Sequence, residues 1–373
     1  MQYTALSTVK QRIQIGAPLP FNVRNADKTL LLARGQQVMS HEQLDALFER
    51  GALVDITELQ SPRDQVRLAP RNELPRLWSQ TMNNVGTALM NAPHHSFRSA
   101  LDDATVPALS LIERDPDLAI FQVLRQEGGP NTEYGVRRSV HAAITAYLVG
   151  QRLGWQADEL EKAFKVALTM NVSMFELQAQ MAKQTTPPTA EQRAELQSHP
   201  LRSVQALVDG GVTDTDWLQA VERHHEMEDG SGYPRGCSDV GDLASLARRA
   251  DIYTSKLSAR NHRDALAADV AGRQMFMEDP GHPMTAALVK EFGIYPPGCH
   301  VRLASGALAI VVQRGLTVST PIVACLTNER GAPLPEPVRV DTSQKGMTVA
   351  AIVGERSVNV KVPLDRLIKL TIG

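Results

Sequence analysis

The stretch HHEMEDGSGYPRG, from His224 to Gly236, joins two adjacent histidines and several acidic side chains to a glycine-rich turn. Imidazole and carboxylate groups are ligands for divalent metals, and glycine lets a backbone approach a bound group closely. Each part alone says little, because paired histidines are often solvated or buried in a core and Asp-Gly-Ser-Gly is ordinary turn sequence. The stretch therefore has to be read together with the chain around it.

Composition limits the classes of partner. The chain has 373 residues, enough for two or three domains, and 43% of them are hydrophobic. The formal net charge of -2 gives no overall attraction for DNA, so a polyanion would need a local basic site, and a small nucleotide is the better candidate. Three scattered cysteines, Cys237, Cys299 and Cys325, form neither a disulfide framework nor a thiolate zinc site.

Targeting signals are not apparent in the sequence. The first residues lack the apolar core of a signal peptide, and no apolar run approaches the roughly 18 residues that a membrane span needs. Few cysteines also suit a reducing compartment. We therefore expect a cytoplasmic protein without a membrane partner.

Hydrophobic periodicity predicts a mainly α-helical protein with two flanking modules. Residues 1–57 are expected to form a small α+β module, and residues 58–75, rich in proline and charge, a linker. Apolar residues at spacings of three and four predict a helical domain over 76–291. Short apolar segments between Gly, Pro and Ser turns predict a barrel-like all-β domain over 292–373.

The stretch from His224 resembles the second signature of the HD-GYP family, HHExxDGxGYPxG, at every defining position. The resemblance covers roughly residues 90 to 290. It implies an HD-type helical domain and a metal-dependent phosphohydrolase that linearises and hydrolyses the bacterial second messenger cyclic di-GMP. It also implies that the recognition loop binds the ligand, through Asp229, Gly230, Gly232, Tyr233 and Pro234.

The resemblance implies a set of metal ligands as well. His199, His224 and His225 match metal histidines of the family, and they are the three that could form a half-site. His141 matches the first metal histidine and Asp251 the final metal aspartate, although His141 lies beside an apolar stripe and would otherwise be taken for a core residue.

Two arginines match phosphate-contacting positions of the family. They are Arg260 and Arg263, which follow the helix expected to carry the final metal aspartate. Without the resemblance, both would be read as solvated cations at the C-terminus of that helix.

The chain departs from the family at its HDxGK motif, which reads Met170-Asn171-Val172-Ser173-Met174. A thioether is a poor ligand for hard or borderline divalent metals, and the amide of Asn171 cannot supply the negative charge that bridges two cations. Met174 in place of lysine removes a cation that would face the substrate phosphate. The resemblance also places Arg137 where three-metal members have a glutamate, which disfavours metal near His141. We therefore expect two-metal hydrolysis to fail.

Three functions stay open. The first is a degenerate HD-GYP protein, inactive or very weak as a phosphodiesterase. It would bind cyclic di-GMP, a related guanine nucleotide, or a signalling partner such as the diguanylate cyclase domains that the family's Gly-Tyr-Pro segment is implicated in docking. The second is a phosphodiesterase in which the three histidines bind one divalent ion with an open position. The third is a scaffold whose imidazoles turn away from one another while Met170 and Met174 fill the old site. The cofactor is accordingly one divalent metal, Fe, Mn or Zn, or none.

Overall fold

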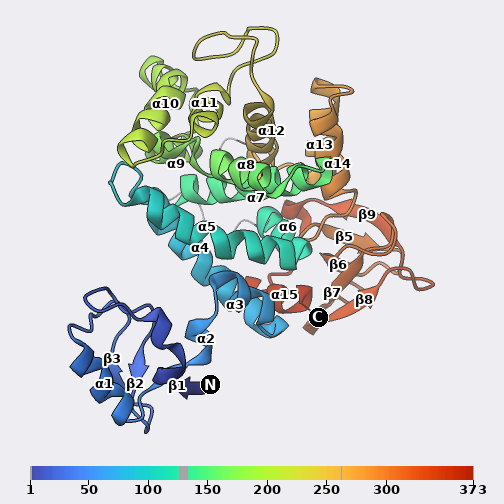
Figure 1. The fold of residues 1–373 in the computed structure, drawn as a ribbon. Helices are drawn as coiled ribbons and strands as arrows, with labels where there is room; N and C mark the ends of the chain where they lie inside the picture. Colours follow the sequence, from blue (N-terminus) through green and yellow to red (C-terminus); the bar gives the residue numbers. More distant parts are fainter. Residues whose placement is uncertain (1, 126–132, 262, 373) are drawn as a thin grey trace. The chain divides into compact units, whose positions relative to one another are not determined.

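The structure, a computed structural model, describes residues 2–125, 133–261 and 263–372. The chain forms two compact units, Met1–Ala69 and Pro70–Gly373, whose elements are labelled in Figure 1. The fold class agrees with the prediction, because a helical domain is accompanied by a small α+β unit and a C-terminal β region. The finer domain limits expected from the sequence stay predictions.

The first unit contains a four-stranded antiparallel sheet of order β1-β4-β2-β3. Its helix α1 begins after Ser40, whose hydroxyl accepts a hydrogen bond from the Gln43 amide at 3.1 Å. The predicted linker contains helix α3, which Ser61 caps through the Asp64 amide. The elements are β1 Tyr3–Ala5, η1 Leu6–Arg12, β2 Val23–Arg24, β3 Leu30–Leu32, α1 His41–Glu49, β4 Leu53–Asp55, α2 Ile56–Leu59 and α3 Pro62–Leu68.

The helical part of the second unit is built around α7, which packs against α8, α12 and α14 (Figure 1). Small side chains let the neighbours approach: a Cβ on Gly150 would lie 2.9 Å from Leu160 Cδ2. The helices are η2 Arg71–Glu73, α4 Leu74–Met90, α5 Phe97–Arg114, α6 Pro116–Leu124, α7 Tyr134–Leu153, α8 Ala157–Thr169, η3 Val172–Met174, α9 Phe175–Lys183, α10 Ala190–Asp209, α11 Thr215–Arg223, α12 Asp242–Leu257, α13 Ala268–Glu278 and α14 Pro283–Phe292.

Helix α11 is fixed to α8 by one buried polar contact. The Trp217 indole is 1% exposed and its Nε1 donates to the Thr169 hydroxyl at 2.9 Å. Thr169 in turn donates to the Lys165 carbonyl at 2.7 Å, so the pair satisfies its hydrogen bonds inside the core. This contact fixes the N-terminal turn of α11, and His224 lies at the other end of the same helix.

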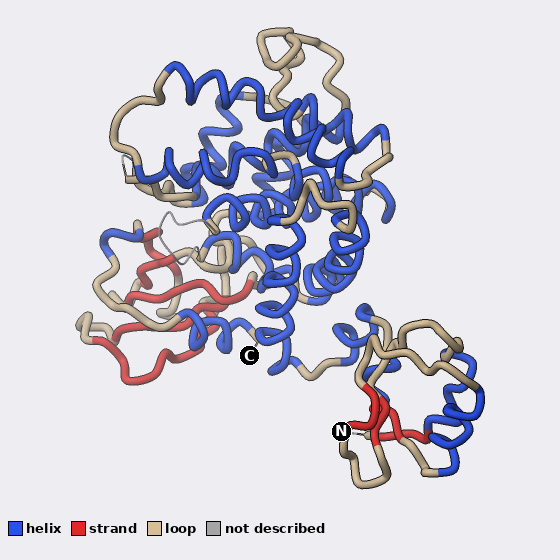
Figure 2. Tube along the Cα trace, turned by 90° about the vertical axis from the view of Figure 1, so that its left-hand side faces the viewer, coloured by secondary structure: helices blue, strands red, loops and turns tan. Residues whose placement is uncertain are grey.

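The C-terminal region is a five-stranded antiparallel sheet of order β8-β7-β6-β5-β9. Figure 2 shows its strands gathered at one side of the helices of the same unit. The sequence predicts a barrel-like domain, whereas β8 and β9 stay edges in the sheet that the structure describes. Helices α6 and α15 cover one face through Phe121 and Leu367, so burial of that face does not require closure. The elements are β5 His300–Leu303, β6 Leu308–Gln313, β7 Ile322–Thr327, β8 Pro333–Asp341, β9 Val349–Val353, η4 Glu355–Ser357 and α15 Leu364–Thr371.

Helices long and apolar enough to cross a membrane do not occur among the described residues.

Candidate metal centre

Three histidines, one from within α10 and two from the C-terminal end of α11, converge in the second unit. His199 lies in α10, His224 caps the C-terminus of α11, and His225 follows it. One ligand atom from each lies within 4.8 Å of the others. The Nε2 atoms of His199 and His224 are 3.1 Å apart. These are the three residues that the sequence analysis grouped as a half-site.

Local sequence explains why His199 and His224 point the same ring atom at each other. Pro200 has no N–H, so the carbonyl of Leu196, four residues earlier, lacks its helical donor. The Nδ1 atom of His199 takes that place at 2.5 Å from the Leu196 oxygen. At the C-terminal end of α11, where carbonyls lack helical partners, His224 Nδ1 lies 2.6 Å from the Val221 oxygen.

These contacts fix the tautomers. A carbonyl oxygen only accepts, so both Nδ1 atoms must donate and both Nε2 atoms carry a lone pair in the neutral ring. Burial, with a smaller contribution from the neighbouring histidine, lowers the pKa of His199 to about 3, and the same holds for His224 and His225. Neutral imidazole is the metal-binding form.

Two facing lone pairs at 3.1 Å repel unless a cation lies between them. Ligands about 2.1 Å from one metal, at angles of about 90–110°, are about 3.0–3.4 Å apart. The separation of the two Nε2 atoms lies within this range. The residues present therefore fit one divalent ion.

The loop after His225 is closed by Glu226, which is 1% exposed. Its carboxylate accepts from the backbone amides of Arg235 at 2.6 Å, Gly236 at 3.2 Å and Cys237 at 3.0 Å. The sequence analysis counted acidic side chains of this stretch as potential metal ligands, but Glu226 organises the loop instead.

The recognition loop lies tightly against His225. The ring of Tyr233 stacks on its imidazole, with 4.6 Å between centroids and 17° between planes. Gly232 allows this approach, because a Cβ there would lie 2.5 Å from the His225 oxygen. Asp229 is exposed and accepts from the Ser231 amide at 2.9 Å and its hydroxyl at 2.6 Å, which lowers the pKa of the Asp229 carboxyl.

Asp251, the predicted metal aspartate, is already paired. Its Oδ1 accepts a hydrogen bond from Arg138 Nη2 at 2.7 Å, in a pair whose side chains are 15% and 7% exposed. Its negative charge acts on His199 and His224, raising their pKa values against the effect of burial. Asp251 thus borders the centre, but it does not belong to the group of converging ligand atoms.

Asn171, at the position of the lost family aspartate, is 2% exposed. Its Nδ2 has no hydrogen-bond partner among the described residues. An unpaired buried amide is costly unless a ligand or water supplies the acceptor. Met170, which precedes Asn171, and Met174, three residues after it, are also buried, at 0% and 7% exposure.

His141 is not one of the three histidines whose ligand atoms converge among the described residues. It lines a cavity of about 740 Å³ together with Trp78, Val136, Arg137 and Val140. Burial, and then Arg137 and Arg138, lower the pKa of His141 to about 3. Its Nδ1 makes no hydrogen bond within the described chain.

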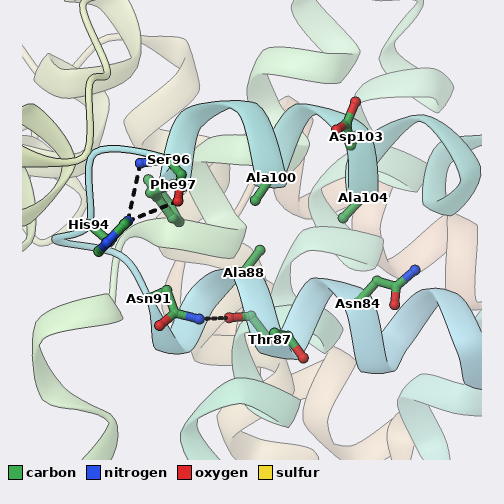
Figure 3. A pocket seen from close by; sticks show the side chains of 10 residues that line it. All are labelled: Asn84, Thr87, Ala88, Asn91, His94, Ser96, Phe97, Ala100, Asp103 and Ala104. Carbon is green, nitrogen blue, oxygen red and sulfur yellow. Dashed lines mark hydrogen bonds between the residues drawn. The ribbon is translucent and has the colours of Figure 1, made fainter. Parts of the chain in front are cut away.

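A further cavity of about 490 Å³, drawn in Figure 3, lies between α4 and α5. Its polar side chains bond locally: Asn91 Nδ2 donates to the Thr87 carbonyl at 2.8 Å, and His94 Nδ1 lies 2.9 Å from the Ser96 hydroxyl. None of the predicted site residues lines it.

Arg260 and Arg263 form a tight turn after α12. Their backbones exchange hydrogen bonds at 2.8 and 3.0 Å, and both guanidinium groups donate to Ser255. The Nε atoms of both are buried without a partner among the described residues. Burial, and then the charges of Arg260 and Arg138, lower the pKa of Arg263. The turn thus concentrates positive charge near Arg138.

Comparison with known proteins agrees with this architecture. The chain is 34% identical over 157 residues to the cyclic di-GMP phosphodiesterase PA4108 of Pseudomonas aeruginosa. The match covers 40% of this chain and 37% of that protein, so the chain spans less than half the length of the curated relative. Bd1817, an HDG"Y"P protein from Bdellovibrio bacteriovorus, is similar in structure.

The chain is therefore similar in part of its sequence to a cyclic di-GMP phosphodiesterase and in its fold to an HDG"Y"P protein. The likeness to Bd1817 has a TM-score of 0.50 at 17% identity, covers 78% of this chain and 98% of that one, and concerns the fold. No family model matches the chain.

Arg138 borders this site through Asp251, but the sequence analysis did not predict a role for it. The resemblance assigns a family position to its neighbour Arg137 and none to Arg138. The available signal was an arginine three residues before His141 on a largely buried helix. A charge on such a helix needs a partner, and here the partner is Asp251.

Proposed function

We propose that this chain is a degenerate HD-GYP protein that binds cyclic di-GMP, or a related guanine nucleotide, beside a single divalent metal. Its phosphodiesterase activity is absent or very weak. The observation that supports this best is the 3.1 Å approach of the His199 and His224 Nε2 atoms, both of which carry a lone pair.

The proposed metal, Fe, Mn or Zn, would be bound by His199, His224 and His225. When bound, it would polarise a phosphoryl oxygen as a Lewis acid. The ligand phosphates would lie against Arg260 and Arg263, whose buried Nε–H donors lack acceptors within the described residues. The recognition loop, fixed by Glu226 and by the stacked Tyr233, would form another wall.

Weak activity follows from the charges that the site lacks. Asn171 is neutral, so it cannot bridge two cations or act as a general base. Asp251 is paired with Arg138, which weakens its attraction for a metal ion. One metal without a positioned base should hydrolyse a phosphodiester far more slowly than two metals would.

A second candidate is a slow phosphodiesterase with a mononuclear centre. Three converging imidazoles with an open coordination position favour it. Hydrolysis of cyclic di-GMP by anaerobically prepared protein with Mn or Fe, above the rate of a His224→Ala control, would establish this candidate. An equal rate in both proteins would reject it.

The scaffold alternative is less well supported. It expects the imidazoles to turn away from one another, whereas the Nε2 atoms of His199 and His224 face each other at 3.1 Å. The burial of Met170 and Met174 is the one feature that it shares with the structure.

Calorimetry with cyclic di-GMP tests the ligand. We expect binding by the wild type and at least a tenfold loss in an Arg260→Ala/Arg263→Ala variant, because each arginine offers charge-assisted hydrogen bonds to phosphate. Arg273→Ala is the control, since that side chain is 76% exposed and belongs to α13. Absence of binding by metal-free and metal-loaded wild type alike would reject the ligand, and GTP and GDP would then be tested in the same way.

A further inference from the structure

We propose that Arg138 determines the composition of this centre: it withholds Asp251 from metal coordination and lends its guanidinium to an anion-binding wall with Arg260 and Arg263. The inference rests on the proposed function, because it concerns the same metal and the same phosphate ligand. Arg138 is a positioning and specificity-determining residue in this role.

The first argument is the geometry of the pair. Arg138 comes from α7 and Asp251 from α12, and the 2.7 Å contact joins two largely buried charges. Arg138 Nη2 also lies 3.4 Å from the Asp251 carbonyl oxygen. A carboxylate that binds a buried guanidinium has lost much of its negative potential for a cation. The metal is then left with the neutral histidines.

The second argument is the charge that results. Three neutral imidazoles do not reduce the charge of a divalent ion, whereas a carboxylate ligand would lower it by one. A centre with its full double charge attracts an anionic ligand more strongly. Pairing Asp251 with Arg138 therefore lowers the affinity of the centre for metal and raises the affinity of the metal-loaded centre for anions.

The third argument is a set of buried donors without acceptors. The Nε atoms of Arg138, Arg260 and Arg263 and the hydroxyl of Tyr134 are buried and have no partner among the described residues. Arg138 donates to Asp251, and Arg260 and Arg263 donate to Ser255 one turn further along α12, so the three guanidinium groups lie on neighbouring turns of this helix. Because arginine only donates, the missing partner must be an acceptor. A phosphate group meets that requirement, with charge-assisted hydrogen bonds.

The test compares metal and phosphate binding in Arg138→Ala. Metal is titrated as Mn²⁺ against a fluorescent chelator, and inorganic phosphate is titrated into the metal-loaded chain by calorimetry. We expect metal affinity to rise about 10- to 100-fold, the usual range for groups that act through a ligand, because Asp251 becomes available. Phosphate affinity should fall at least tenfold. A merely structural arginine would not move the two affinities in opposite directions.

Three further variants complete the test. In Arg138→Ala/Asp251→Asn the gain in metal affinity should disappear, because the released carboxylate is gone. Arg138→Lys keeps the pair's charge and should bind metal within about threefold of the wild type. Arg138→Gln, which removes the charge but keeps a hydrogen-bond donor, replaces Arg138→Ala if the latter does not fold. Arg137→Ala is the matched control, because Arg137 precedes Arg138 on α7 but lines the cavity of His141.

Each outcome decides between the inference and the proposed function. Equal metal affinity in wild type and Arg138→Ala would overturn the role of Arg138 and leave a one-metal centre standing. If metal binds to Arg138→Ala but not to the wild type, the role of Arg138 is supported, and the proposal that the wild type binds one metal is overturned. Metal in neither protein would overturn both.

Discussion

Glu226 offers a sharp test of how the recognition loop is fixed. Its carboxylate is the acceptor for three backbone amides, those of Arg235, Gly236 and Cys237. In Glu226→Ala all three lose their partner, and each buried donor left unpaired costs about 1–3 kcal/mol. Water can enter at a loop, so the lower figure applies to each amide. The sum is about 3 kcal/mol, equivalent to roughly a hundredfold change in an equilibrium.

The loop should open locally, so the assay is amide hydrogen exchange of residues 235–237 in the full-length chain. We expect these amides to exchange roughly a hundredfold faster in Glu226→Ala. Glu226→Gln should give an intermediate result, because the amide oxygen can still accept from Arg235 and Gly236 while its NH₂ group faces the Cys237 amide. Asp229→Asn is the control, since the hydrogen bonds that Asp229 accepts within the described chain come from Ser231 of its own exposed turn. Unchanged exchange in Glu226→Ala would refute the reasoning.

Four other outcomes follow from the same contacts. His224→Ala removes one of the three proposed metal ligands. Elemental analysis of anaerobically purified protein should therefore show about one metal per chain for the wild type and less than a tenth of that for the variant. A variant that keeps its full metal content would contradict the three-histidine metal centre. Burial lowers the pKa of His141 to about 3 in the folded chain, from about 6.5 for a free imidazole. Between these two values only the unfolded state binds the proton, so stability must fall as the pH drops from 6.5 toward 3. His141→Phe should lessen that fall in urea unfolding followed between pH 7 and 5, and an unchanged slope would count against a neutral buried imidazole. Trp217→Phe removes the indole donor to Thr169 and should lower the free energy of unfolding by about 1 kcal/mol. If this hydrogen bond forms, the effects of Trp217→Phe and Thr169→Val on the free energy of unfolding should not add in the double variant. Tyr233→Ala should weaken a pull-down of a diguanylate cyclase domain if that loop docks such a partner, while Arg235→Ala, further along the loop, serves as the comparison.

Much of the fold could be predicted because hydrophobic period is a local property. Apolar spacing of three and four predicted the helical domain, because this period arises between neighbours along the chain. Residues 358–362 alternate in apolar character but carry no strand, whereas β9 Val349–Val353 pairs with β5. Alternating apolar residues do not state which strand they pair with, and α15 was missed because its apolar face is short.

The candidate site was less accessible to such reasoning. The contact between Arg138 and Asp251 joins residues 113 positions apart, on helices whose relative rotation depends on the whole core. A linear pattern can indicate which residue types are present, but not which charge a neighbouring helix brings beside them.

His199-Pro200 shows the opposite case, in which two adjacent residues determine a chemical property. Because Pro200 has no N–H, the Leu196 carbonyl is free to accept a hydrogen bond from Nδ1–H of His199, and Nε2 then carries the lone pair. If this chain of causes holds, Pro200→Ala restores an amide donor to Leu196 and competes with His199 for it. The ring then loses its fixed tautomer, and metal affinity should fall although no ligand has been changed. The same titration with Mn²⁺ measures the fall, and ¹⁵N spectra of the histidine rings report the tautomer directly. A Pro200→Ala chain with unchanged tautomer and unchanged affinity would show that the fold alone orients His199, and that the proline has no part in the centre.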